Sequence, residues 1–365
     1  PLGDPAGVGP DSLAEAGGQA TLRVGHALLG RVLDGLGRPL DGRPLPQGSL
    51  EPWPLERAAP DPLSRPRIRH PLQLGVRALD GLLTAGEGQR IGLFAGSGVG
   101  KSTLLGQIAR QTNADICVVC LVGERGREVR EFIEESLGDE GLARSVVVCA
   151  TSDAPPLVRL KSARVATSVA EYFRAAGQRV LLLMDSVTRY ARALREVGLA
   201  AGEPPARRGY PPSVFAALPR LLERTGTSPE GSITAIYTVL VEGGDMEEPI
   251  ADEVRGILDG HVVLTREQAH RGHWPAIDVL QSLSRVMGEV TTAEHRAAAA
   301  KLRELLAAYE RRRDLIALGA YERGSEPITD RAVDLMPRFE AFLRQRPDEE
   351  STFDDTVAAL RRLFV

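Results

Sequence analysis

The sequence predicts an α/β fold with a largely parallel sheet, followed by a small helical domain. Between residues 71 and 290, apolar stretches of strand length alternate with helical stretches. This alternation is typical of βαβ units, whose crossover helices pack on a parallel sheet. Beyond residue 291 the chain is rich in Ala, Leu, Glu and Arg, and its apolar residues recur at helical spacing. The strand candidates span 90–95, 116–122, 145–150, 180–185 and 232–241, and the helix candidates span 294–318, 330–345 and 353–364.

The first 70 residues have a different composition. They contain many glycines and prolines, and Asp-Gly turn signals separate short apolar stretches. We therefore expect short strands and a connector in 1–70, an α/β domain in 71–290 and a helical domain in 291–365. The chain starts at Pro1 with a Gly/Pro-rich segment and has no initiator methionine, so we expect a fragment that lacks its natural start.

Composition limits the classes of partner. The 365 residues are 43% hydrophobic and 26% charged, as in a globular protein with material for two or three domains. The net charge of −4 gives no electrostatic reason to expect a nucleic acid as the main partner. A nucleic-acid motor would need a basic channel with aromatic side chains, and only 4% of the residues are aromatic. No apolar run approaches the roughly 18 residues that span a bilayer, so we expect peripheral membrane contact only.

The three cysteines favour a reducing compartment. Cys117, Cys120 and Cys149 are too few, and odd in number, for a disulfide framework, which makes the cytosol the expected location. Cys117 and Cys120 form a CxxC pattern inside the strand candidate 116–122. Because their odd spacing along a strand sends them to opposite faces, we do not expect redox chemistry or zinc binding there.

Residues 95–102, AGSGVGKS, have the pattern of a phosphate-binding loop, apart from alanine in place of the first glycine. They follow a strand candidate and precede the helical stretch 103–110, which is the context that such a loop requires. Glycines let backbone N–H groups point at phosphate oxygens, and the following helix N-terminus favours an anion. Lys101 would neutralise the β- and γ-phosphates of a nucleotide, and Ser102 would offer Mg²⁺ a hydroxyl ligand. The predicted nucleotide-binding residues of the loop are Gly96, Ser97, Gly98, Val99, Gly100, Lys101, Ser102 and Thr103.

Two carboxylates are candidates for the hydrolytic chemistry. The apolar strand candidate 180–185 ends in Asp185, a pattern typical of the acid on the Mg²⁺ side of nucleotide hydrolases. The alternative is an aspartate that caps the following helix. Glu124 stands just after the strand candidate 116–122, at the carboxyl end where open α/β sheets bind ligands, and could polarise an attacking water. On these residues alone, a solvated charge in an exposed loop explains Glu124 equally well.

Longer motifs indicate a family. The phosphate loop is accompanied by VGERGREV at 122–129, MDSVTRYARA at 184–193, PIADEVRGILDGHVVLTR at 249–266 and WPAIDVLQSLSRVM at 274–287. With these motifs the chain resembles, over almost its whole length, the rotary family of F-type and V-type ATPases, flagellar export ATPases and type III secretion ATPases. It is most similar to the type III secretion group.

The resemblance implies a fold and an assembly. The implied fold is a RecA-like P-loop NTPase core with a remnant of an N-terminal β-barrel within residues 1–70 and a C-terminal helical domain. The implied assembly is a homo-oligomeric ring of six subunits that hydrolyses ATP with Mg²⁺. Ser102 and Asp185 are the implied metal ligands, and Lys101 is implied to act in catalysis as well as in binding.

The resemblance also assigns residues beyond the loop. Glu124 matches the family's catalytic glutamate, and Arg125 is its neighbour. Arg189 matches an arginine on the γ-phosphate side, and Arg285 matches an arginine finger that reaches the nucleotide of a neighbouring subunit. Trp274 falls where relatives place an aromatic side chain, usually tyrosine, that stacks on adenine. The alternative for Trp274 is an ordinary core side chain.

For function, the resemblance implies ATP hydrolysis that energises type III protein secretion through chaperone release and unfolding of exported proteins. The implied partners are stalk and regulator proteins of the export apparatus and chaperone–effector complexes, and the implied location is the cytoplasm, peripheral at the inner-membrane secretion apparatus. A flagellar protein export ATPase is the closest alternative, followed by the catalytic subunit of another rotary ATPase. A non-catalytic nucleotide-binding subunit would typically lack the glutamate or the lysine, whereas both Glu124 and Lys101 are present.

Overall fold

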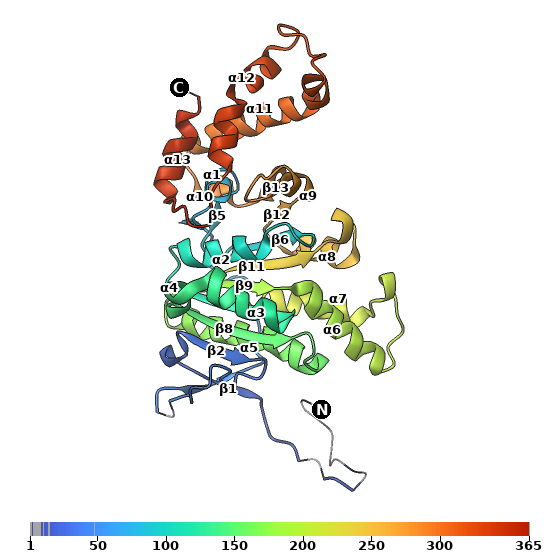
Figure 1. Cartoon of the computed structure of the whole chain (residues 1–365). Helices are drawn as coiled ribbons and strands as arrows, with labels where there is room; N and C mark the ends of the chain where they lie inside the picture. The colour runs from blue at the N-terminus through green and yellow to red at the C-terminus, as the bar shows by residue number, and fades with distance from the viewer. Residues whose placement is uncertain (1, 3–8, 10, 14, 47, 365) are drawn as a thin grey trace.

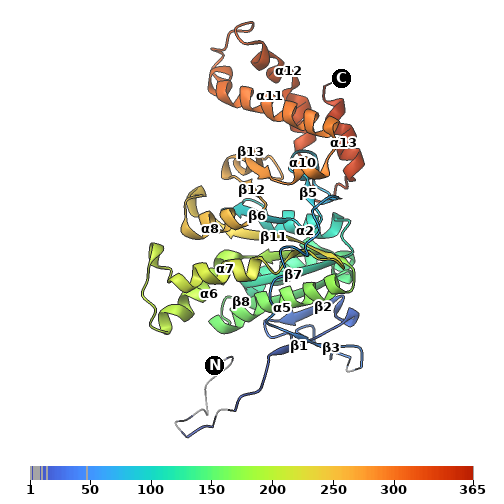
Figure 2. The same cartoon turned by 180° about the vertical axis from the view of Figure 1, so that it is seen from behind.

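A computed structural model shows a layered α/β protein with a helical region at one end (Figure 1). It describes residues 2, 9, 11–13, 15–46 and 48–364. The strands of the central sheet stack along the long axis of the molecule (Figures 1 and 2). The C-terminal helices lie beyond one edge of the sheet, and the N-terminal strands lie at the other edge. The predicted α/β class with helices at the C-terminal end is therefore confirmed.

The central sheet has nine strands and is mostly parallel. Its strands are β2 (Arg31–Asp34), β6 (Arg90–Ala95), β7 (Ile116–Glu124), β8 (Ser145–Thr151), β9 (Arg179–Asp185), β10 (Gly226–Thr227), β11 (Ser232–Leu240), β12 (Gly260–Leu264) and β13 (Ile277–Ser284). Eight follow the order β13-β12-β6-β11-β9-β7-β8-β2, and β10 pairs with β11. Within the described chain, only β12–β13 and β10–β11 are antiparallel pairs of this sheet. The five strand candidates correspond to β6, β7, β8, β9 and β11, with ends that differ by at most two residues.

Helices cover both faces of the sheet. The helices are α2 (Lys101–Gln111), α3 (Gly126–Glu131), α4 (Gly138–Ala143), α5 (Pro156–Ala175), α6 (Val187–Ala200), α7 (Pro212–Leu222) and α8 (Pro249–Ile257). The first three pack on one face, seen in Figure 1, and the other four share a core with the opposite face. Cys117 belongs to the first core and Cys120 to the second, so their predicted separation onto opposite faces is confirmed. Burial raises the pKa of the Cys117 thiol to about 12.

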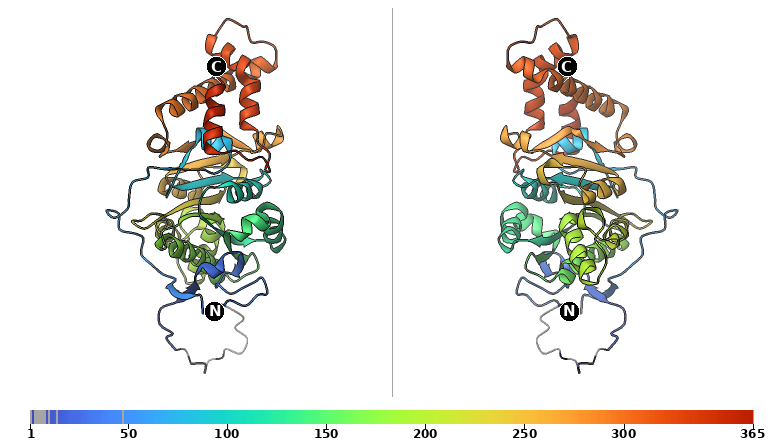
Figure 3. Two further views of the ribbon diagram at one scale, coloured as in Figure 1. Left: turned by 90° about the vertical axis from the view of Figure 1, so that its left-hand side faces the viewer. Right: turned by 90° about the vertical axis from the view of Figure 1, so that its right-hand side faces the viewer.

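Short strands and turns surround this sheet. The outer strands are β1 (Thr21–Val24), β3 (Glu51–Pro54), β4 (Pro71–Leu72) and β5 (Ala85–Gly86), and the short helical turns are η1 (His26–Leu28), η2 (Phe132–Leu137), η3 (Arg207–Gly209) and η4 (Glu242–Gly244). β1 pairs with β3 and β4 with β5, and a connector from β3 to β4 runs along the side of the molecule (Figure 3). Because β2 pairs with β8, part of the region 1–70 lies in the central sheet. The domain boundaries at 70 and 290 stay predictions.

The C-terminal helices pack on the core beside the phosphate loop. The helices of this end are α1 (Arg77–Leu82), α9 (Arg266–His270), α10 (Met287–Val290), α11 (Ala293–Ala317), α12 (Pro327–Leu343) and α13 (Phe353–Arg362), and the last three overlap the predicted helices. Buried His295 on α11 places Nε2 2.8 Å from the Gly81 carbonyl oxygen. After α12, the Gln345 amide donates a 2.9 Å hydrogen bond to the Gly75 carbonyl. Among the described residues, no helix is long and apolar enough to cross a membrane.

The contact between α2 and η2 generates a stability prediction. A Cβ at Gly106 would lie 2.4 Å from the Ser136 carbonyl oxygen, so Gly106→Ala should destabilise the fold by about 2 kcal/mol although alanine favours helices. Gly256, which is exposed on α8, has no neighbouring atom within 4 Å of such a Cβ. Gly256→Ala should therefore stabilise by about 0.5–1 kcal/mol. Urea unfolding of both variants measures these opposite signs, and equal stability of the two would contradict the described contact.

Candidate nucleotide-binding and catalytic site

The phosphate loop connects β6 to α2. Of the eight loop residues predicted from the sequence, 96–100 connect the two elements, and 101–103 form the first turn of α2. Gly98 and Gly100 have φ angles of +76° and +78°, a left-handed conformation that glycine adopts without the steric cost of a side chain. Val99 between them is buried, whereas the Ser102 side chain is exposed. The first N–H groups of α2 have no partner inside the helix, so loop and helix together offer donors to an anion.

Glu124 and Asp185 meet Lys101 at the carboxyl edge of the sheet. The lysine follows β6, and the two carboxylates end β7 and β9. Lys101 Nζ forms an ion pair with Asp185 and lies 3.9 Å from Glu124 Oε1. The Thr238 hydroxyl on β11 donates a 2.7 Å hydrogen bond to Asp185 Oδ1. Glu124 is only 7% exposed, so the interpretation of this residue as a solvated charge in a loop is wrong.

Arg189 joins the same group of charges from the first turn of α6. Its guanidinium forms an ion pair with Glu124. The hydroxyl of Ser186 caps α6 by accepting a hydrogen bond from the Arg189 N–H at 3.3 Å, so the capping role considered for Asp185 belongs to its neighbour. Gly123 has a φ angle of +70°, and a Cβ there would lie 3.1 Å from the Arg189 side chain. Burial lowers the pKa of Arg189 from its ordinary value.

We call Lys101, Glu124, Asp185 and Arg189 the charge cluster. It contains two cations and two anions, and each carboxylate contacts a cation. Such mutual compensation is needed because an ion that is buried without a partner costs several kcal/mol. The arrangement places a general-base candidate, a lysine and an arginine beside a loop that suits phosphate, which is the chemistry of phosphoryl transfer to water.

Two of the predicted catalytic arginines lie outside the charge cluster. The Arg125 side chain is 79% exposed and pairs with Glu128 at 3.3 Å. Arg285 follows β13 and is exposed, and its backbone N–H donates a 3.0 Å hydrogen bond to the Asp259 carbonyl. Throughout the residues that the structure describes, no hydrogen bond or ion pair joins either guanidinium to the charge cluster. The action of Arg285 on a neighbouring subunit therefore stays a prediction.

A pocket of about 640 Å³ lies beside the phosphate loop. The Trp274 ring forms one wall, and a Cβ at Gly100 would lie 2.8 Å from its Cζ3 atom. Trp274 is 41% exposed, so it is not an ordinary core side chain. Further wall residues are Thr103 and Gln107 on α2 and Arg346 and Pro347 after α12. Its aromatic and apolar walls next to a phosphate loop suit a nucleotide base.

Two parts of this site were not predicted from the sequence. Thr238, which binds Asp185, is a polar residue in the carboxyl half of the apolar strand β11, and that pattern could have drawn attention to it. The segment 344–349 carries no local signal. Its place is determined by tertiary contacts, including a 2.9 Å hydrogen bond from the Gln345 N–H to the Trp274 carbonyl.

A phosphate loop followed by a helix, with a lysine and two buried carboxylates at neighbouring strand ends, defines a P-loop nucleoside triphosphatase. Comparison with family models refines this class. Residues 75–284 match the ATP synthase alpha/beta family, nucleotide-binding domain, and residues 291–362 match the T3SS EscN ATPase C-terminal domain. The chain therefore belongs to the ATP synthase alpha/beta family and is an ATPase. The family resemblance expected from the motifs is confirmed.

The chain is similar to known proteins over most of its length. It is 57% identical over 364 residues to the flagellum-specific ATP synthase of Bacillus subtilis, which covers 100% of this chain and 83% of that protein. It is 58% identical over 340 residues to the type 3 secretion system ATPase of Xanthomonas euvesicatoria, covering 92% and 76%. The solved structure of the assembled ATPase EscN from the type III secretion system of enteropathogenic E. coli matches with a TM-score of 0.89 and 52% identity, covering 94% of this chain and 84% of EscN.

Replacement of Trp274 tests the base pocket. Trp274→Ala should weaken binding of ADP because stacking on the base is lost, by about 1 kcal/mol or roughly fivefold in Kd. Trp274→Tyr keeps an aromatic face and should retain most of the affinity. Isothermal titration with each variant gives the comparison, after circular dichroism has shown that both are folded. Unchanged affinity in Trp274→Ala would remove this side chain from nucleotide binding.

Proposed function

We propose that this chain hydrolyses ATP as one subunit of a homo-oligomeric ring, a hexamer when fully assembled, that energises type III protein secretion. The observation that carries the proposal is the position of two arginines. Arg189 lies in the charge cluster, whereas Arg285 is exposed and binds none of its members. A site that uses Arg285 is completed by a second copy of the chain. The description of EscN as an assembled ATPase supports such a ring.

The proposed hydrolysis uses the charge cluster as follows. Backbone N–H groups of the phosphate loop bind the β- and γ-phosphates, and Lys101 neutralises them. Glu124, 3.9 Å from Lys101 Nζ, accepts a proton from the water that attacks the γ-phosphorus. The bond to the ADP oxygen breaks as the new phosphorus–oxygen bond forms. Arg189 holds Glu124 in orientation, and Arg285 of the neighbouring copy stabilises the charge on the departing ADP oxygen.

Magnesium fits the oxygen atoms near the loop. Ser102 presents an exposed hydroxyl at the start of α2, and Asp185 presents a carboxylate whose Oδ1 is held by Thr238. Mg²⁺ prefers such hard oxygen ligands and keeps several waters. Ser102 and Asp185 would hold the ion, which would supply neutralisation of phosphate charge. We assign Arg125 no atom of this reaction, and its predicted catalytic role stays a prediction.

The role of Glu124 is tested by Glu124→Gln. This variant should bind nucleotide normally while kcat falls by about 10²–10⁴, because the amide cannot accept the proton of water. Glu131→Gln is the matched control, since Glu131 lies exposed on α3 and pairs only with Arg127 among the described residues. Steady-state phosphate release and nucleotide titration of both variants supply the two quantities. Turnover near the control level in Glu124→Gln would exclude this residue as the base.

The assignment of Arg285 to a neighbouring site is tested by mixing two inactive variants. Arg285→Ala should bind ATP and lose a factor of about 10³–10⁵ in rate, as expected for an arginine finger supplied in trans. Lys101→Ala should be inactive because phosphate binding is impaired. In mixed oligomers, an intact phosphate loop from the first chain meets an intact Arg285 from the second. These interfaces should hydrolyse ATP at protein concentrations where light scattering shows assembly.

The mixing experiment has a clear negative result. If mixed oligomers form but release phosphate no faster than either variant alone, Arg285 does not act in trans. A concentration series of the unmodified chain provides an independent check, because ATP turnover per subunit should rise with assembly.

The cellular role rests on the relatives. EscN has been solved in complex with its central stalk EscO, which supports a stalk protein as a partner of this chain. We extend the proposal to regulator proteins and chaperone–effector complexes, and to a cytoplasmic location at the inner-membrane secretion apparatus. Flagellar export is the second candidate, since the flagellum-specific relative is as similar as the secretion relative. Recovery of export-apparatus components with the tagged protein, and loss of either secretion or motility on deletion, separates the two.

A further inference from the structure

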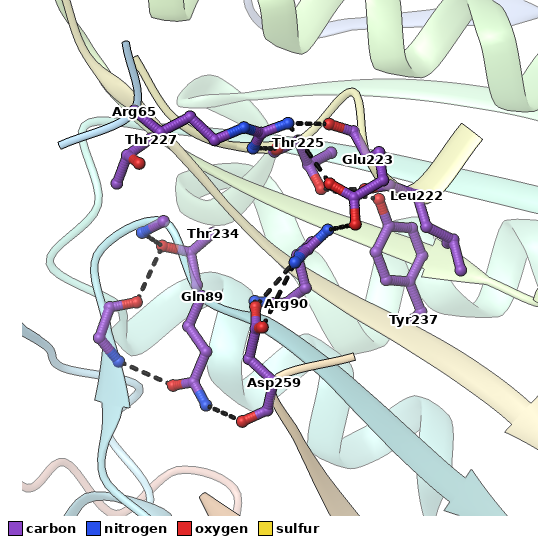
Figure 4. A network of polar contacts seen from close by, with 12 residues as sticks. Arg65, Gln89, Arg90, Leu222, Glu223, Thr225, Thr227, Thr234, Tyr237 and Asp259 are labelled. Atoms are coloured by element: carbon purple, nitrogen blue, oxygen red, sulfur yellow. Dashed lines mark hydrogen bonds and ion pairs between the residues drawn. The ribbon is translucent and has the colours of Figure 1, made fainter. Parts of the chain in front are cut away.

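Residues 284–285 are here called the finger segment because they include Arg285. A backbone hydrogen bond holds this segment close to the start of β6. The Asp259 carbonyl oxygen accepts a 3.0 Å hydrogen bond from the Arg285 N–H. The same oxygen accepts a second bond, also 3.0 Å, from the Gln89 side-chain amide (Figure 4). One carbonyl oxygen therefore connects the residue before β6 with the proposed arginine finger.

Gln89 is a fully buried side chain whose polar atoms are all engaged. Its Oε1 accepts a hydrogen bond from the Gly86 N–H at 2.9 Å, and its Nε2 lies 3.2 Å from Ser284 Oγ. The Ser284 hydroxyl in turn donates a 2.8 Å bond to the Thr84 carbonyl. The residue directly before Arg285 is thereby fixed through its side chain, while Arg285 is fixed through its backbone. Such a buried, satisfied network leaves little freedom to the chain that it holds.

Asp259 is itself fixed to the first residue of β6. Its N–H donates a 2.9 Å hydrogen bond to the Arg90 carbonyl. Its Oδ2 accepts bonds of 3.1 Å from both the N–H and the Nε of Arg90. Arg90 also forms a 2.5 Å ion pair with Glu223 (Figure 4). Glu223 thus shares Arg90 with Asp259, but among the described residues no hydrogen bond or ion pair joins it to residues 284–285.

Gly260 lets β12 and β13 approach Gln89. A Cβ at this position would lie 2.6 Å from the Leu283 carbonyl oxygen and 3.1 Å from Gln89 Nε2. Gly260 also pairs directly with Ser284 in the ladder between the two strands. The absence of a side chain here therefore allows the finger segment to pack against the amide that holds it.

The two ends of β6 are therefore connected to two different nucleotide-binding sites. Its last residue leads into the phosphate loop of its own subunit, and its first residue is joined through Asp259 to the finger of the neighbour's site. We propose that Gln89 is a positioning residue that sets the reach of Arg285 toward the nucleotide bound by the neighbouring copy. This inference rests on the proposed in-trans action of Arg285. A displacement of about 1 Å at a reacting group can cost about a hundredfold in rate, so the anchor of the finger affects turnover.

The experiment uses the mixture of Lys101→Ala and Arg285→Ala chains and introduces Gln89→Met into one of the two chains at a time. In the Lys101→Ala chain, which supplies the finger, the substitution should lower the recovered ATPase rate about tenfold. In the Arg285→Ala chain, which supplies the phosphate loop, it should leave the recovered rate unchanged. In a ring made only of Gln89→Met, kcat should fall while KM for ATP stays constant. A merely structural role would affect both chains of the mixture alike.

Two further variants complete the design. Glu223→Gln removes a partner of Arg90 that does not contact the finger segment, so it should leave the recovered rate unchanged in either chain. Ser284→Ala removes the hydroxyl that contacts Gln89 and the Thr84 carbonyl, and it should act in the finger chain alone, with about a threefold loss. It replaces Gln89→Met in the comparison if that variant does not fold.

Each outcome has a defined meaning. Equal losses in the two chains, or no loss in either, overturn the positioning role of Gln89. A loss with Glu223→Gln that equals the loss with Gln89→Met also overturns it, because the effect would then belong to the surroundings of Arg90. If the parent mixture of Lys101→Ala and Arg285→Ala recovers no activity, the in-trans action itself fails, and this inference fails with it. A loss confined to the finger chain supports the inference.

Discussion

The parallel pairing of β6, β11, β9 and β7 is the constraint on which the site depends. Parallel strands end at the same edge of a sheet, so the ends of three separate segments arrive beside the phosphate loop. The register is specific: Leu240 lies opposite Ala95, and Leu121 lies opposite Asp185. A slip of one residue would turn each side chain to the other face and would separate Lys101 from its carboxylate partners.

Mutual compensation of charge follows from this geometry. Lys101 and Arg189 lie among the same buried carboxylates, and removal of any one member leaves an uncompensated ion. A bound triphosphate adds negative charge next to Lys101, so phosphate oxygens and carboxylates compete for the same cation. In the proposed hydrolysis, Lys101 would therefore exchange carboxylate partners for phosphate oxygens. This competition gives the site a physical means of distinguishing bound nucleotide states.

Two contacts join the site to the rest of the molecule. The Gln345 N–H binds the Trp274 carbonyl, so the wall of the base pocket is attached to the chain that follows α12. At the other end of β6, Arg90 and Asp259 attach the segment of Arg285 to the strand that leads into the phosphate loop. These contacts connect the base pocket to the C-terminal helices, and they connect the strand before the phosphate loop to the surface proposed to face the next subunit.

The sequence by itself determined the strands, the long helices, the phosphate loop and the separation of Cys117 from Cys120. These features follow from the spacing of apolar residues and from short motifs, which are properties of residues close together in the chain. Longer motifs also determined the family. Only the tertiary structure decided that Glu124 is buried, that Ser186 caps α6 in place of Asp185, and that β2 joins the central sheet. It alone brought residues 344–349 to the base pocket and Gln89 to the finger segment. These features arise from contacts between segments far apart in the chain, and the free energy of such contacts is not contained in any local pattern.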